Sequence, residues 1–223
     1  MALSYYITSR KQLFGRPGPG GSRDALGQED ALKEKVRAAF AAGVGFVQVR
    51  EKDLGGARLA ALVEEFAGLP EKQDTQLLVN ERLDVALSSG ADGVHLPSDS
   101  MPVSEARRLA GSGAWVGISC HGASDVERAE CEGASYVLLS PLFETPSKPG
   151  VHPLGLDLFQ AICRSVLIPV FALGGVTASN AEACIRAGAA GVAGIRLFQE
   201  TADIGGLCRY LRSLGTRDGR FNE

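Results

Sequence analysis

Short hydrophobic runs alternate with amphipathic stretches along the whole chain. Four segments share one pattern, in which a small residue and a glycine precede another small residue and an apolar run. These segments are AAGVGFVQVR (41–50), SSGADGVHL (88–96), CEGASYVLL (131–139) and RAGAAGVAGI (186–195). The pattern is typical of a helix that ends at a glycine and turns directly into a buried strand. Strands that are hydrophobic at nearly every position are typical of parallel sheets, which are covered on both faces.

The same patterning over the rest of the chain predicts eight strands and eight helices. Strands are expected near residues 4–8, 44–50, 76–79, 92–96, 115–119, 135–139, 168–173 and 190–195. Helices are expected near residues 31–42, 56–67, 83–89, 103–110, 123–132, 155–164, 179–187 and 203–214. Eight strand–helix units are the content of a (β/α)8 TIM barrel, whereas doubly wound α/β sheets usually have five or six strands. We therefore predict a single-domain α/β TIM barrel over residues 1–214, with the doubly wound sheet as the second choice.

Three segments do not fit the repeat. Residues 15–28 are rich in glycine and proline and are expected to form an insertion after the first strand. Residues 140–154 are expected to form a long loop after the sixth strand, and residues 215–223 a flexible tail. Because loops that follow the strands line the active face of a TIM barrel, the long loop is the better candidate for a functional site.

Composition narrows the classes of partner. The 223 residues include 23 basic and 26 acidic side chains, a net charge of −3, so no excess of positive charge favours nucleic acid or an anionic membrane. Five cysteines without a C-x-x-C spacing fit reduced thiols better than disulfides or zinc ligands. The sequence shows neither the layout of a secretory signal nor an apolar run of membrane-spanning length. We expect a cytoplasmic protein, with a homodimer as a candidate state.

The expected end of the second strand carries the first candidate site residues. Alternation along Gln48-Val49-Arg50-Glu51-Lys52 places Gln48, Arg50 and Lys52 on one side. An arginine and a lysine at one strand end suit a cluster of anionic oxygens. The alternative is that both cations pair with nearby carboxylates at the rim.

Further polar residues follow the other strands. Asn80 follows the third strand, where it is either a ligand group or a helix cap, and His95 ends the fourth. Ser119 and His121 end the fifth, and His121 is a candidate acid/base group. The last three strand ends offer hydroxyl groups, positive charges and glycine backbone N–H groups, all of which suit phosphate oxygens. These candidate residues are Thr145, Ser147, Lys148, Gly174, Gly175, Gly194, Ile195 and Arg196. Together these ends predict a site for two anionic groups, a phosphate and a diphosphate.

Five stretches of the chain resemble the thiamine phosphate synthase superfamily, which includes the synthase and a related thiazole tautomerase. They are VQVREK (47–52), VNERLDVALSSGADGVHLPS (79–98), GISCH (117–121), SPLFETPSKPG (140–150) and IPVFALGGVTASNA (168–181). A synthase of this superfamily couples 4-amino-2-methyl-5-hydroxymethylpyrimidine diphosphate to thiazole phosphate carboxylate and releases pyrophosphate. The resemblance implies that the diphosphate substrate is held by Gln48, Arg50, Lys52, Asn80 and Lys148. It also implies that Thr145, Ser147 and Gly175 line the thiazole phosphate site, and that Mg²⁺ offsets the diphosphate charge.

Three departures from the superfamily pattern keep other functions open. The metal motif N-D-R reads Asn80-Glu81-Arg82, and the second metal aspartate falls on Ser100, one residue after Asp99, so the candidate metal ligands are Glu81 and Asp99. Arg196 stands where the superfamily usually has a small residue. A metal-independent thiazole tautomerase that acts on thiazole phosphate carboxylate through His121 is therefore one alternative. The other is a non-catalytic regulatory protein that binds phosphorylated ligands.

Overall fold

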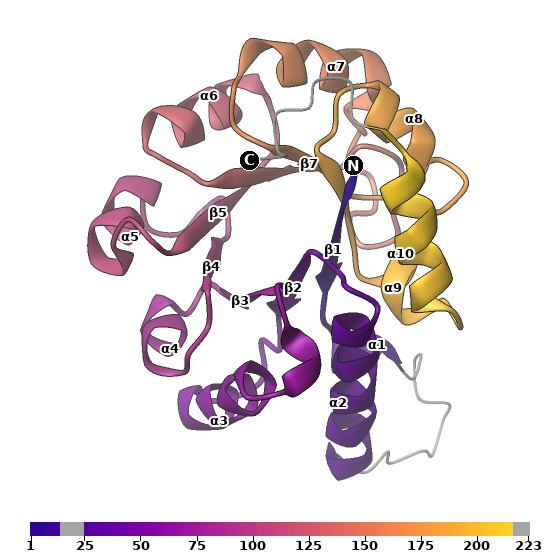
Figure 1. The fold of residues 1–223 in the computed structure, drawn as a ribbon. Coiled ribbons are helices and arrows are strands. Elements are labelled where there is room, and N and C mark those ends of the chain that lie inside the picture. Colours follow the sequence, from indigo (N-terminus) through magenta and orange to yellow (C-terminus); the bar gives the residue numbers. More distant parts are fainter. Residues whose placement is uncertain (14–24, 216–223) are drawn as a thin grey trace.

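The computed structural model describes residues 1–13 and 25–215, and eight parallel strands close into a barrel. The strands are β1 (Leu3–Ile7), β2 (Phe46–Val49), β3 (Gln76–Asn80), β4 (Gly93–Leu96), β5 (Trp115–Cys120), β6 (Tyr136–Leu139), β7 (Val170–Ala172) and β8 (Gly191–Gly194). Each strand pairs with the next in the sequence, and β8 pairs with β1. Helices surround the strands as an outer ring (Figure 1). The predicted TIM barrel is confirmed.

The helices connect successive strands on the outside of the barrel. They are α1 (Arg10–Leu13), α2 (Ala25–Ala41), α3 (Gly56–Ala67), α4 (Leu83–Ser88), α5 (Val103–Ala110), α6 (Ala123–Cys131), α7 (Gly155–Ser165), α8 (Ala181–Arg186), α9 (Arg196–Gln199) and α10 (Ile204–Ser213), with the 3-10 helix η1 (Pro70–Lys72). All eight expected helices are present. The short elements α1, η1 and α9 were not expected, because three or four residues show no helical period.

Glycines with positive φ end the helices of the four repeated segments, as their pattern predicts. At the first of them, the Gly43 N–H donates to the Phe40 carbonyl (2.8 Å) and the Val44 N–H donates to the Ala39 carbonyl (3.1 Å). These bonds satisfy the last carbonyls of the helix and need a left-handed residue, which is least costly for glycine. The four φ angles are +68° at Gly43, +72° at Gly90, +85° at Gly133 and +102° at Gly188.

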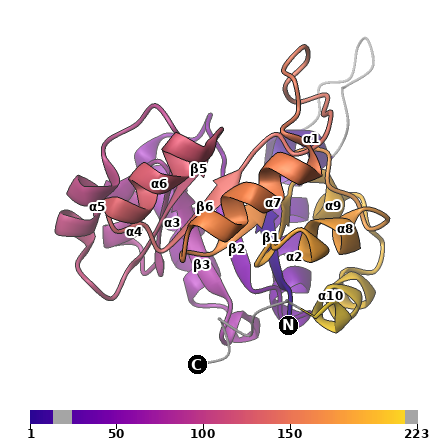
Figure 2. The same cartoon turned by 90° about the horizontal axis from the view of Figure 1, so that it is seen from above.

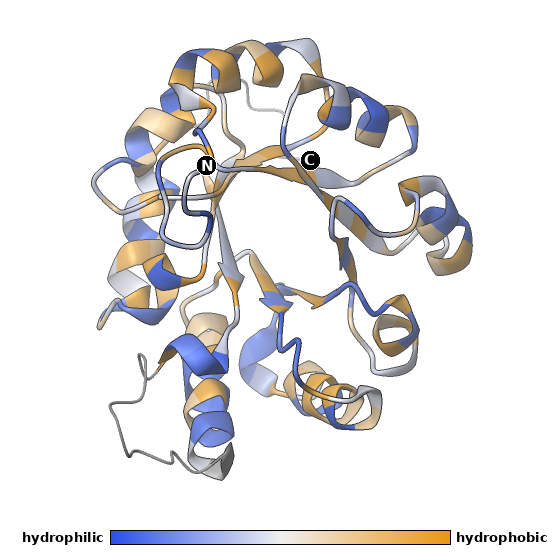
Figure 3. Ribbon diagram, turned by 180° about the vertical axis from the view of Figure 1, so that it is seen from behind, coloured by the Kyte–Doolittle hydropathy of each residue, from blue (hydrophilic) through white to orange (hydrophobic). Residues whose placement is uncertain are grey.

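Alternation along the strands divides the hydrophobic side chains into an inner and an outer layer. Tyr5 on β1 points into the barrel, whereas its neighbour Tyr6 belongs to the layer between strands and helices. Hydropathy follows this arrangement, since the strands are largely hydrophobic and the helices carry both hydrophobic and hydrophilic stripes (Figure 3). The inner layer consists of Tyr5, Ile7, Phe46, Leu78, Tyr136, Leu138, Phe171 and Ala193.

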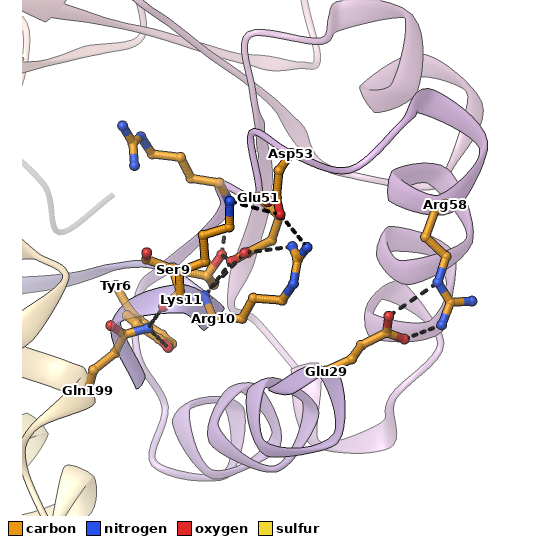
Figure 4. A network of polar contacts seen from close by, with 11 residues as sticks. Tyr6, Ser9, Arg10, Lys11, Glu29, Glu51, Asp53, Arg58 and Gln199 are labelled. Carbon is orange, nitrogen blue, oxygen red and sulfur yellow. Dashed lines mark hydrogen bonds and ion pairs between the residues drawn. The ribbon is translucent and has the colours of Figure 1, made fainter. Parts of the chain in front are cut away.

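The expected insertion over residues 15–28 is wrong for its last four residues. Helix α2 begins at Ala25, six residues before the predicted start. A glycine and three polar residues, Gly27 to Asp30, interrupt the helical period near its start, and part of the support comes from another helix. Glu29 pairs with Arg58 of α3, as Figure 4 shows, and also with Lys33 one turn further along α2 (3.3 Å). Residues 15–24 of the insertion and 216–223 of the tail lie outside the described residues.

The carboxyl ends of the strands and the loops that follow them share one end of the barrel. In Figure 2 the connection from β6 to α7 extends away from the body of the barrel at the end where α1 lies. The other end holds the N-terminus and α10 (Figure 2). Within residues 1–13 and 25–215, no helix is long and apolar enough to cross a membrane.

Candidate functional site

A cavity of about 660 Å³ opens at the carboxyl end of the barrel. Its volume lies within the range of sites for small molecules, about 300–1,000 Å³. Each of the eight strands contributes at least one lining residue at or next to its carboxyl end, so the site depends on closure of the whole barrel. The residues contributed in strand order are Ile7, Gln48, Arg50, Asn80, His95, Ser119, Leu138, Ser140, Leu173, Ala193, Gly194 and Ile195.

The cavity brings together all the residues that the sequence analysis proposed for catalysis and substrate binding. They are Gln48, Arg50, Lys52, Asn80, Ser119, His121, Thr145, Ser147, Lys148, Gly174, Gly175, Gly194, Ile195 and Arg196. The two candidate metal ligands, Glu81 and Asp99, are exposed and do not line it. The carboxylates that do line the cavity are Glu144 and Glu200, which sequence reasoning did not single out.

The end of β2 turns alternate side chains toward the cavity and away from it. Gln48, Arg50 and Lys52 line the cavity, as alternation predicts, whereas Glu51 is buried on the other side. The Thr8 hydroxyl donates to Glu51 Oε1 (2.7 Å), and the same hydroxyl oxygen accepts from the Arg50 N–H (2.9 Å). Thr8, the residue that follows β1, therefore holds the backbone from which the two cations project.

Other cations already neutralise the carboxylates on either side of Lys52. Arg10 Nη1 donates to Glu51 Oε2 (3.1 Å), and Arg10 Nη2 donates to Asp53 Oδ2 (2.7 Å), as Figure 4 shows. Lys11 Nζ also lies 3.1 Å from Asp53 Oδ2. Burial raises the pKa of Glu51, and its bonds from Thr8 and Arg10 oppose that shift.

Arg50 and Lys52 form no ion pair with any described residue, and neither do Lys148 and Arg196. The alternative in which Arg50 and Lys52 pair with neighbouring carboxylates is therefore not what the structure shows. Partial burial lowers the pKa of Arg50, while the negative charges of Glu51 and Glu81 oppose that change. Unpaired cations at a concave, partly dry site favour binding of an anion.

His121 lies beside Lys148 at the rim of the cavity. Its Nδ1 donates to the Ser140 carbonyl (2.7 Å), so Nε2 is the nitrogen left for the cavity side, where the Ser98 hydroxyl lies 3.3 Å away. Lys148 Nζ is 3.5 Å from both ring nitrogens of His121. Partial burial lowers the pKa of Lys148. The pair supplies one cation and one group able to accept or donate a proton.

The glycine pair after β7 allows two loops to pack closely. Gly174 and Gly175 have φ of +92° and +67°. A Cβ on Gly174 would lie 2.8 Å from Cα of Pro141, and one on Gly175 would lie 2.7 Å from Cβ of Phe143. Among the described residues, neither backbone N–H has a protein acceptor. The pair thus forms a tight turn and also leaves N–H donors for a ligand.

His95 is a buried part of the site rather than a rim residue. It is 2% exposed, and burial together with the charge of Arg50 lowers its pKa to about 3, so the ring is neutral. Its Nε2 lies 2.9 Å from the Ser119 hydroxyl, which lines the cavity. A single histidine in a hydrophobic strand carries no sign of this contact, because its partners come from other strands.

The candidate metal ligands do not make a Mg²⁺ site by themselves. Glu81 and Asp99 lie outside the cavity, and no group of three histidine, cysteine, aspartate or glutamate side chains could hold a metal within the part of the chain that the structure describes. Mg²⁺ demands oxygen ligands in near-octahedral geometry. The donor set on this face therefore does not fit a protein-built magnesium centre.

Unpaired cations and glycine-rich strand ends at the carboxyl face of a TIM barrel define a barrel protein that binds small phosphorylated molecules. A family model described as thiamine monophosphate synthase matches residues 22–198. The chain belongs to this family of enzymes.

Relatives with the same description share much of the chain. The thiamine-phosphate synthase of Chloroflexus aurantiacus is 39% identical over 180 residues, which are 80% of this chain and 83% of the relative. The thiamine-phosphate synthase of Methanoculleus marisnigri is 38% identical over 190 residues, 85% of this chain and 90% of the relative. Both alignments span most of the two chains compared.

Solved structures agree on the architecture. A thiamine phosphate pyrophosphorylase from Pyrococcus furiosus superposes with a TM-score of 0.77 and 27% identity, over 95% of this chain and 94% of that chain. A 3-hexulose-6-phosphate synthase, at 16% identity and a TM-score of 0.61 over 96% of this chain and 97% of that one, shares the fold alone.

Proposed function

We propose that this enzyme couples 4-amino-2-methyl-5-hydroxymethylpyrimidine diphosphate to a thiazole phosphate and releases pyrophosphate. The observation that carries the proposal is a set of three cations, Arg50, Lys52 and Lys148, which form no ion pair with a described residue and line one cavity with the glycine turn after β7. The relatives named as synthases support it. A binder of one phosphate would have little use for three cations from two separate strand ends.

In the proposed reaction, the bond between the pyrimidine methylene carbon and the diphosphate oxygen breaks, and its electron pair leaves with pyrophosphate. The lone pair of the thiazole nitrogen forms the new carbon–nitrogen bond. Arg50, Lys52 and Lys148 stabilise the charge that develops on the departing oxygen. Because they are already in place and unpaired, little rearrangement is needed when that charge appears. The protein otherwise acts by positioning the two substrates.

The thiazole phosphate is assigned to donors of the same cavity other than these three cations. Thr145 and Ser147 offer hydroxyl donors, and the backbone N–H of Gly175 offers a third. Arg196, at the start of α9, adds a positive charge that can bind the phosphate as an ion pair. Two sets of donors on one cavity suit two different phosphorylated substrates.

The test is a coupling assay with both substrates and Mg²⁺, in which thiamine phosphate is oxidised to fluorescent thiochrome. Multiple turnovers by the wild type, with kcat/KM reduced about 100-fold or more in Lys52→Ala, are expected, since loss of one charge-stabilising donor typically costs that much. Lys33→Ala is the control, because Lys33 pairs with Glu65 on the outer helices and should leave the rate unchanged. A folded protein that binds both substrates without forming product would refute the proposal.

Two other outcomes correspond to the alternative functions. Exchange of the thiazole phosphate carboxylate tautomers without coupling, abolished in His121→Asn, would identify a tautomerase. Binding of phosphorylated ligands without turnover of either substrate would identify a regulatory protein.

A further inference from the structure

A row of hydrogen bonds crosses the barrel interior directly beneath the cavity. The Ser119 hydroxyl lies 2.9 Å from His95 Nε2, and His95 Nδ1 lies 3.1 Å from the Tyr136 hydroxyl. The Tyr136 and Tyr5 hydroxyls are 2.8 Å apart. Tyr5 donates to Gln48 Oε1 (3.0 Å), and Gln48 Nε2 donates to Asn80 Oδ1 (2.8 Å). We call these six residues the interior row, and both of its ends, Ser119 and Asn80, line the cavity.

The interior row has one direction, because each tyrosine hydroxyl has a single proton. Gln48 turns its carbonyl oxygen toward Tyr5, so the Tyr5 proton goes to Gln48. The Tyr5 oxygen must then accept the proton of Tyr136. With its own proton committed, the Tyr136 oxygen can only accept from His95, and His95 therefore carries its proton on Nδ1.

The direction continues to the serine at the cavity. His95 is neutral, since it is fully buried and its pKa is lowered to about 3. With the proton on Nδ1, its Nε2 has a lone pair and accepts the Ser119 proton. Ser119 is left with oxygen lone pairs facing the cavity. At the far end, Asn80 accepts from Gln48 with its carbonyl oxygen, which leaves its amide N–H groups as donors.

We propose that Tyr5 and Tyr136 are positioning residues that fix the tautomer of His95 and thereby make Ser119 a hydrogen-bond acceptor toward the substrate. Neither tyrosine reaches the cavity, and both are buried in the inner layer. With the opposite tautomer, the Ser119 oxygen would accept from His95 and its proton would point at the substrate. One lone pair of Ser119 would then be taken by His95, and a substrate N–H or O–H donor would compete with the freed Ser119 proton for that side of the oxygen, a mismatch that typically reduces binding about 10- to 100-fold. The role of Ser119 toward the substrate rests on the proposed function, whereas the tautomer of His95 does not depend on it.

The tautomer can be measured in the wild-type protein without any substrate. Histidine labelled with ¹⁵N is incorporated, and long-range ¹H–¹⁵N correlations distinguish a protonated ring nitrogen from one with a lone pair. The signals of His95 are assigned by their loss in His95→Gln. A protonated Nδ1 and an unprotonated Nε2 are expected. A protonated Nε2, or exchange between the two tautomers, would overturn the proposal even if coupling activity is present.

Removal of the hydroxyls tests the link to catalysis. Tyr136→Phe removes the acceptor of His95 Nδ1–H, and Tyr5→Phe frees the Tyr136 proton to point at His95. Each is expected to shift the His95 tautomer and to lower kcat/KM about 10-fold or more. Tyr6→Phe is the matched control, because Tyr6 is equally buried on β1 but its hydroxyl accepts from Gln199 in the outer layer (3.3 Å). A loss of rate in Tyr6→Phe as large as in Tyr136→Phe would contradict a specific positioning role.

A double variant separates positioning from loss of stability. In a Ser119→Ala background the interior row has no acceptor at the cavity, so adding Tyr136→Phe should lower kcat/KM no further. Additive losses in kcat/KM would show that Tyr136 acts by another route and would refute the proposal. If Tyr136→Phe does not fold, Tyr5→Phe takes its place in this cycle. Absence of coupling by the wild type would refute the proposed function alone, since the tautomer measurement would stand.

Discussion

Gly117 lies on β5 where the ring of Tyr136 crosses the barrel interior, and alanine at this position should destabilise the fold. A Cβ on Gly117 would overlap the ring carbons and the hydroxyl oxygen of Tyr136. The ring cannot move aside without disturbing its neighbours, because it packs against Phe46 (5.6 Å between centroids) and Phe171 (5.7 Å). Closely packed interiors respond to an added methyl group with strain rather than free adjustment.

The size of the effect follows from the contacts at risk. Overpacking of a core typically costs about 1–3 kcal/mol. The Tyr136 hydroxyl also has two buried hydrogen bonds, of 2.8 Å and 3.1 Å, each contributing about 1 kcal/mol when intact. The expected loss in free energy of unfolding is about 3–5 kcal/mol, which is a large share of the ~5–15 kcal/mol typical of a domain.

The assay is urea unfolding followed by the fluorescence of Trp115, the single tryptophan of the chain. Trp115 packs edge-on against Phe46 in the same inner layer, with ring centroids 5.2 Å apart, so it reports loss of that layer. Gly113→Ala is the control, because nothing lies within 4 Å of the added Cβ, and a change within about 0.5 kcal/mol is expected there. Equal stability of Gly117→Ala and Gly113→Ala would refute the packing argument.

Three further predictions concern the site. The native state keeps the Glu51 proton to a higher pH than the unfolded chain, whose pKa is near 4.5, so this group lowers stability as pH rises through its raised pKa. The unfolding free energy of Glu51→Gln relative to wild type should therefore improve over that range, and a pH-independent difference in urea titrations would contradict it. In calorimetry, the substrate-free protein should show no saturable Mg²⁺ binding below about millimolar concentrations, because Mg²⁺ sites usually rely on substrate phosphates. Tight Mg²⁺ binding that is lost in Glu81→Gln would show instead that the protein forms a magnesium site by itself. Gly175→Ala should weaken phosphate binding and lower stability, since φ is +67° and the new Cβ would press on the β6–α7 connection. Gly122→Ala, in extended backbone with open space around the new Cβ, should do neither. Equal thermal unfolding and equal phosphate affinity in the two variants would count against the close packing.

Local patterns were sufficient for the barrel and for the location of the candidate site. The helix-ending glycines and the hydrophobic runs are short-range signals, and each unit of the barrel repeats them. Once eight parallel strands are expected, their carboxyl ends must meet at one face, which is why Arg50, Lys148 and Gly175 could be assigned to one site from sequence. The start of α2 could not be assigned in this way, because Gly27 and the polar residues after it interrupt the apolar period and Glu29 is supported by Arg58 of another helix.

The sequence by itself therefore determined the order of strands and helices and the residues that reach the carboxyl face. Tertiary structure alone decided which of these residues are buried, ion-paired or hydrogen-bonded. It pairs Glu51 and Asp53 with Arg10, which leaves Arg50 and Lys52 without an ion-pair partner in the part of the chain that the structure describes, and it keeps Glu81 away from the cavity. It also joins Tyr5 to Tyr136 across 131 positions of the chain. Burial, ion pairing and hydrogen-bond direction depend on which side chains meet across the closed barrel, and no pattern within one strand contains that information.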